Sequence, residues 1–123
     1  MVSILNFSNL MYRYSPEVDA LYCKINLPYI YDYTIPVNPI FNIDICEVKE
    51  VVAFELLDAS KVLKVTPDDL LKDKPRIKIT VQVTTDVIKV VFNILTSTGE
   101  MGGFSVKALN ENNASVGVYY YST

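Results

Sequence analysis

Acid–base or metal chemistry in this chain would have to rest on carboxylates, because the sequence contains no histidine. Two short segments carry the four acidic residues of most interest, which are Glu17, Asp19, Glu55 and Asp58. If the strands beside them pair, their oxygens could converge on a hard cation such as Mg²⁺ or Ca²⁺. A structural interpretation is favoured: Glu17 and Asp19 suit a turn. Asp58 suits a helix cap, and Glu55 suits the solvent-facing side of a strand.

Other catalytic arrangements lack their parts. Without histidine the chain can form neither a Ser-His-Asp triad nor a Cys-His pair. The phosphate-binding patterns G-x-x-x-x-G-K-[ST] and G-x-G-x-x-G are absent from the sequence. Its one glycine pair, Gly102-Gly103, fits a flexible loop over residues 96–103. We therefore expect a protein without a catalytic role and without a cofactor.

The two cysteines, Cys23 and Cys46, are predicted to be free thiols. Cys23 alternates with Leu21, which indicates the buried side of a strand. Cys46 alternates with Asn42 and Asp44, which indicates the exposed side of another. Two thiols on opposite sides do not suit a disulfide, and two cysteines without histidine do not make the usual zinc site.

Tyrosines suggest a contact surface. Residues 28–39 contain three prolines and three tyrosines, so this segment is predicted to be an edge strand or an extended loop. Its tyrosines would share one side if the chain is extended, and tyrosine is enriched at protein interfaces. The alternative is that they pack on their own domain. A second group of tyrosines lies near the C-terminus. Together with it, the candidate interface residues are Tyr29, Tyr31, Tyr33, Tyr119 and Tyr121.

A basic sheet face is the second candidate surface. Four cations could share the outer face of a C-terminal sheet, near Tyr119 and Tyr121; they are Arg76, Lys78, Lys89 and Lys107. Basic and aromatic side chains on a sheet can bind single-stranded nucleic acid. The net charge of −3 gives no general attraction to nucleic acid or anionic lipid. It favours the plainer interpretation, a solubilising face opposite a β core.

The elements predict an α+β fold, mainly antiparallel, with about seven or eight strands and one or two short helices near residues 58–73. Short strands are expected over residues 2–7 and 10–14, and a hairpin over residues 41–56. Thr66 is a good N-cap, followed by Pro67 at the first helical position.

The second half is predicted to be β. Apolar residues alternate cleanly over residues 76–83 and again over residues 88–94. With a two-residue loop at Thr85-Asp86, every apolar position of one strand faces an apolar position of the other, whereas an odd loop would reverse one face. Strands over residues 104–109 and 116–121 complete the set.

Bulk properties point to a single domain over residues 1–123, since half the residues are apolar. No apolar run approaches the length of a membrane span. The first seven residues lack the basic start of a signal peptide. We therefore expect a cytoplasmic protein that does not enter a membrane.

Two segments carry a family resemblance. Residues 14–22, Y-S-P-E-V-D-A-L-Y, resemble a Y-D-P-E-A-D-A-L-Y signature, and residues 51–60, V-V-A-F-E-L-L-D-A-S, resemble V-V-G-I-E-I-L-D-A-S. Both signatures belong to the small proteins called domain of unknown function 2283. The resemblance covers residues 12–63 and implies a compact antiparallel β unit ending in a short helix. Residues 76–123 lie outside it, as a β-rich C-terminal extension.

The resemblance implies no activity, but members often lie beside small toxin-like genes. Our leading interpretation is a non-catalytic protein–protein interaction module that self-associates as a dimer. One alternative is an antitoxin-like or regulatory partner of a neighbouring gene product. Further alternatives are the carboxylate-based divalent-metal site and the single-stranded nucleic-acid binder.

Overall fold

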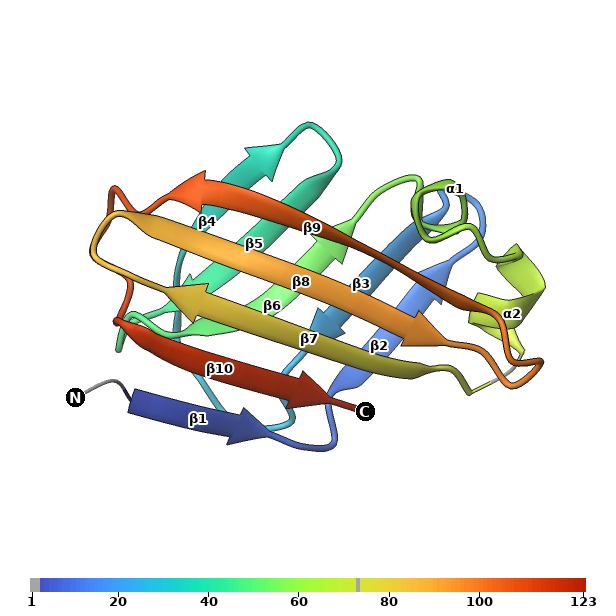
Figure 1. Ribbon diagram of the computed structural model, residues 1–123, viewed down its shortest axis with the longest axis horizontal. Coiled ribbons are helices and arrows are strands. Elements are labelled where there is room, and N and C mark those ends of the chain that lie inside the picture. The colour runs from blue at the N-terminus through green and yellow to red at the C-terminus, as the bar shows by residue number, and fades with distance from the viewer. Residues whose placement is uncertain (1–2, 73) are drawn as a thin grey trace.

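The computed structural model describes residues 3–72 and 74–123 and shows two five-stranded sheets packed face to face (Figure 1). Sheet A has the order β1 (Ser3–Phe7), β10 (Gly117–Ser122), β7 (Arg76–Val83), β8 (Val87–Leu95) and β9 (Met101–Leu109). Sheet B has the order β2 (Met11–Ser15), β3 (Ala20–Lys24), β6 (Val51–Leu56), β5 (Phe41–Cys46) and β4 (Tyr31–Asn38). Two short helices, α1 (Ala59–Leu63) and α2 (Pro67–Leu71), connect β6 to β7 along the chain.

The predicted α+β, mainly antiparallel class is confirmed, although the described residues form ten strands rather than seven or eight. The two N-terminal strands, β1 and β2, join different sheets, and β1 pairs in parallel with β10. β4 is an edge strand, as its prolines predict. None of the described helices is long and apolar enough to cross a membrane.

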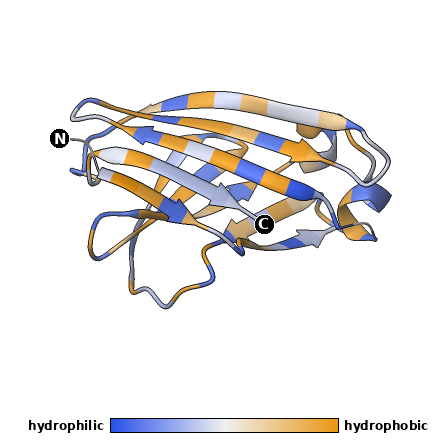
Figure 2. Cartoon of the chain, turned by 60° about the horizontal axis from the view of Figure 1, so that its bottom comes forward, coloured by the Kyte–Doolittle hydropathy of each residue, from blue (hydrophilic) through white to orange (hydrophobic). Residues whose placement is uncertain are grey.

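Alternation of apolar and polar residues builds sheet A. Val83 pairs with Ile88, and Thr84 N donates to Val87 O at 2.9 Å, which confirms the two-residue loop. The inward positions of β7 and β8 are buried, and Figure 2 shows the alternating hydrophobic and hydrophilic bands along these strands. The predicted helix start is also confirmed, because Thr66 and Asp69 form a reciprocal capping box around Pro67.

The predicted flexible loop over residues 96–103 is shorter than expected. Gly102 and Gly103 belong to β9. A Cβ atom on Gly102 would lie 1.9 Å from the backbone oxygen of Leu63, the last residue of α1. Glycine is required here because the end of α1 approaches the strand too closely for a side chain, so the pair marks a packing contact.

Tyr121 joins the two sheets. Its hydroxyl, on β10 of sheet A, donates to the backbone oxygen of Val51 on β6 of sheet B at 2.6 Å. The pairing of β5 with β6 shifts register at this end of β6, so the acceptor stands beside a bulge. The Tyr121 ring stacks on Phe7, with centroids 5.1 Å apart, and meets Phe54 edge-on at 5.0 Å.

We predict that Tyr121→Phe lowers the free energy of unfolding by about 1–3 kcal/mol, because the Val51 carbonyl loses its donor inside the core. Urea denaturation would measure the change. Tyr120→Phe is the matched control, since the neighbouring ring is 45% exposed. Equal effects of the two substitutions would contradict this role of the Tyr121 hydroxyl.

Candidate interaction surfaces

Asp19 connects the turn between β2 and β3 to helix α1. Its carboxylate accepts from the Tyr14 hydroxyl at 2.6 Å, from Ser60 N at 3.0 Å and from Ser60 Oγ at 2.8 Å. Asp58 occupies the N-cap position with φ 52° and makes no side-chain cap, so Asp19 caps α1 from another part of the chain. The two segments of the family resemblance therefore meet at this contact.

The protonation of this contact is set by its hydrogen bonds. Burial alone would raise the Asp19 pKa, but hydrogen bonds from Tyr14 and Ser60 outweigh burial and hold it below its ordinary value. Burial and the bond to Asp19 raise the Tyr14 pKa to about 12. The pair therefore stays as carboxylate and phenol at neutral pH, a structural arrangement.

We predict that Asp19→Asn lowers the free energy of unfolding at neutral pH by about 1.5–3 kcal/mol, the usual worth of hydrogen bonds to a charged group. Because the folded pKa lies below the unfolded one, this stability is complete above about pH 4 and is lost as the pH falls through the folded pKa. In urea titrations, the difference in the free energy of unfolding between wild type and variant should therefore become smaller as the pH falls through this range.

Glu17→Gln is the control for this experiment, because Glu17 is an exposed carboxylate two residues away in the same turn. It should leave both the stability and its acid dependence nearly unchanged. A constant difference between wild type and Asp19→Asn down to acid pH would show that the carboxylate charge is not the stabilising feature.

The four candidate carboxylates do not converge. The Asp19 carboxylate accepts hydrogen bonds from Tyr14 and Ser60, and the Glu55 carboxylate on β6 accepts one from Asn42 Nδ2 at 3.4 Å. Within residues 3–72 and 74–123 no group of three Asp, Glu, Cys or His side chains could hold a metal ion. The geometry thus gives the divalent-metal hypothesis no support.

The three tyrosines of the proline-rich segment have different surroundings. Tyr31 is 54% exposed, whereas Tyr33 is half-buried, packs on the core and lies under the Lys49 ammonium, 5.3 Å from its ring centroid. A register shift separates Tyr31 from Tyr33 on β4, so they do not form the single tyrosine row that regular alternation predicts. Tyr29 precedes the strand and is half-buried.

Tyr119 and Tyr121 are not surface residues, which corrects their assignment as interface candidates. Both are buried between the sheets, opposite Val81 and Ile79 of β7. Tyr120 takes the outward position. Three consecutive tyrosines have no polarity difference to mark the inner face, but the pairing of β10 with the apolar positions of β7 decides it.

Cys46 is also buried, contrary to the prediction that it faces outward. Residues 25–30 cross this end of sheet B and are held there by the hydrogen bond from Glu47 N to Ile30 O, 2.8 Å long. The crossing segment lies beside Cys46. Both cysteines are free, as predicted. Burial raises the pKa of the Cys23 thiol well above its ordinary value, which removes the thiolate needed for nucleophilic chemistry.

The same segment forms a hollow of about 230 Å³ at one end of the sandwich, which we call the end hollow. Its lining is mostly apolar and includes Glu47 and Glu50. Three of its lining side chains are large, apolar and exposed: Leu27 is 59% exposed, Ile30 64% and Val48 67%. Leu27 and Tyr29 also line an adjacent hollow that reaches Tyr31. Large apolar side chains gathered around one concavity are typical of a protein contact site.

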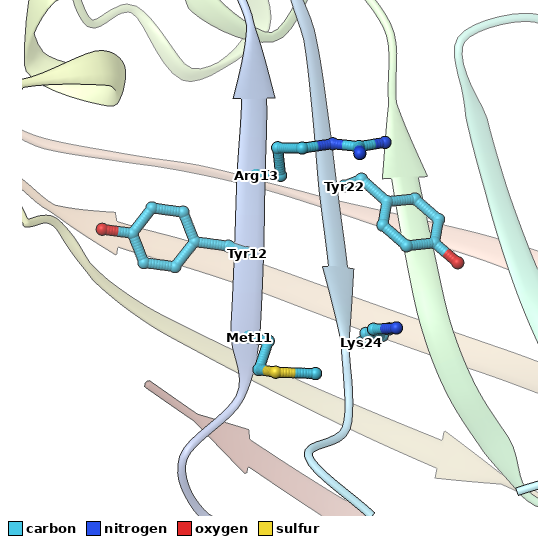
Figure 3. A pocket seen from close by; sticks show the side chains of 5 residues that line it. All are labelled: Met11, Tyr12, Arg13, Tyr22 and Lys24. Atoms are coloured by element: carbon cyan, nitrogen blue, oxygen red, sulfur yellow. The ribbon is translucent and has the colours of Figure 1, made fainter. Parts of the chain in front are cut away.

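Another hollow, of about 380 Å³, lies at the exposed edge of sheet B (Figure 3). It is lined by Met11, Tyr12, Arg13, Tyr22 and Lys24. Figure 3 shows Tyr12 pointing away from the other four, past the edge strand. Burial first, then the nearby Tyr29, Asp44 and Glu55, raise the Tyr22 pKa to about 12. Its phenol therefore stays protonated at neutral pH.

The cationic residues of sheet A share its outer surface. Arg76, Lys78, Lys89 and Lys107 are exposed, and Lys89 pairs directly with Lys107. The five described strands of this sheet contain no Asp or Glu. We call the outward side of sheet A, with these four cations, the cationic face. Tyr120, rather than its neighbours, is the exposed aromatic residue of β10 there.

Comparison of the chain with protein-family models, with curated proteins and with solved structures found no match. The resemblance of residues 12–63 to domain of unknown function 2283 therefore stays a prediction.

Proposed function

We propose that this protein is a non-catalytic protein–protein interaction module that self-associates as a dimer through the end hollow and its apolar rim. The observation that carries the proposal is the convergence of exposed Leu27, Ile30 and Val48 on one concavity. Tyr29 lines the same hollow, so part of the sequence-predicted tyrosine surface belongs to it. Removal of these apolar side chains from water favours association.

A second copy is the partner that suits this surface. The patch contains both protruding side chains, such as Ile30, and a concavity beside them, so a two-fold axis can place each copy's projections in the other's hollow. Addition of a strand at the nearby β4 edge is disfavoured, because Pro36 and two register shifts interrupt its pairing pattern. Association should therefore use side chains rather than a continued sheet.

The expected affinity is modest. Burying six large aliphatic side chains across a two-fold would contribute on the order of 10 kcal/mol. Association itself costs about 4–15 kcal/mol in lost freedom. With the cost near the low end of this range, a surplus of roughly 6 kcal/mol remains, which corresponds to a dissociation constant on the order of tens of micromolar. This predicts a reversible, concentration-dependent dimer rather than an obligate one.

We predict that light scattering across a concentration series gives a mass that rises from monomer to dimer, and that Ile30→Asp holds the protein at the monomer mass. The matched control is Ile4→Asp, the same substitution at a residue 65% exposed against 64% for Ile30, but on sheet A. It should leave the dimer intact. Loss of the dimer in both variants would exclude the end hollow as the specific contact.

A strict monomer at every concentration would end the self-association proposal. A heterologous partner, such as the antitoxin-like or regulatory pairing that the family resemblance suggests, would then be the favoured alternative for the same apolar surface.

A further inference from the structure

The strands of sheet A carry positive charge only. The chain carries a net charge of −3, yet the strands of sheet A hold four cations and no carboxylate. Sheets in a sandwich pack about 10 Å apart, so their outer side chains lie further apart still. The Debye length at 0.1 M salt is about 10 Å. The outward carboxylates of sheet B, such as Asp44 and Glu55, are therefore screened from a ligand on the cationic face.

This face also contains a hollow, of about 430 Å³, where β1, β10 and β7 run side by side. Tyr120 stands between Asn6 and Thr80 in the strand pairing, and Lys78 pairs with Ser122. All five line the hollow. It thus combines a partly exposed aromatic ring, an ammonium group, an amide and hydroxyls, which are the groups that stack on a base, bind phosphate and bond to base edges.

We propose that the cationic face binds single-stranded nucleic acid, with one base stacked on Tyr120 in this hollow and phosphates bound by Lys78, Lys89 and Lys107. Lys89 and Lys107 are adjacent across β8 and β9, which continues the positive surface away from the hollow. The face is a sheet without a projecting helix or ribbon for a duplex groove, whereas an unstacked base can reach Tyr120.

The net charge of −3 favours a solubilising role for this face. The sequence also places Tyr119 and Tyr121, rather than Tyr120, near it. The structure buries both and exposes Tyr120 beside Lys78. The linings of the two hollows share Phe7, but Tyr120, Lys78, Lys89 and Lys107 do not line the end hollow. Substitutions at these four residues can therefore weaken nucleic-acid binding without removing the apolar contact proposed for the dimer.

The test is fluorescence anisotropy of the full chain with a labelled single strand of about 12 thymidines at about 50 mM salt. Binding should weaken with added salt, with a log–log slope of about −0.7 for each phosphate contact. Lys89→Gln with Lys107→Gln should reduce that slope by about 1.4. Tyr120→Ala should weaken binding at least about fivefold through lost stacking.

Two exposed residues of sheet B are the controls: Lys24→Gln removes a cation and Tyr31→Ala an aromatic ring from elsewhere on the surface. Both should bind as wild type does. The proposal is overturned if the strand does not bind, if the controls weaken binding as much as the sheet A variants, or if a duplex of equal length binds as tightly. Light scattering of the sheet A variants should show unchanged self-association.

Discussion

The hydrogen bond from the Tyr121 hydroxyl to the Val51 carbonyl is the contact on which the rest of the sandwich depends. Its partners are 70 residues apart in sequence and belong to different sheets. The inward faces of both sheets form one hydrophobic cluster, so residues 12–63, which supply sheet B and α1, share a core with the β-rich extension over residues 76–123. A carbonyl beside a bulge needs a donor, and the long phenol of Tyr121 supplies it without opening the core to water.

Asp19 performs a related task at the other end of sheet B. Two turns with left-handed residues, at Asp19 and Asp58, bring the β2–β3 corner against the start of α1. The carboxylate then satisfies the helix N–H and hydroxyl of Ser60. Asp19, one of the four candidate metal ligands, is thereby used for helix capping, and α1 is held close enough to β9 to require Gly102.

Patterns with one strict period predicted much of this fold. The β7–β8 hairpin followed from alternation and an even loop, and α2 followed from Thr66 and Pro67, because both signals are local. Local sequence patterns do not predict burial or strand pairing where a segment from elsewhere in the chain determines them. Cys46 is buried by a segment that crosses the end of its strand. β1 and β2 belong to different sheets because β1 pairs with β10 from the other end of the chain, while β2 pairs with β3. The inner face of β10 is determined by its pairing with β7. Of the end hollow, Tyr29 was predictable from composition, whereas Leu27, Ile30 and Val48 come together only in three dimensions.

The two proposed surfaces arise from the same core. Burying alternate residues of ten strands sends the remainder outward, and in sheet A those outward residues include cations without balancing acids. At the end of the sandwich the constraint is different, because residues 25–30 must cross from one strand to another over a polar turn and cannot bury all their apolar side chains. Ile30 stays exposed although its backbone bonds to Glu47. An apolar end and a cationic face are thus chemically distinct surfaces whose hollows meet at Phe7, so one could join copies of the chain while the other stays open to an anionic ligand.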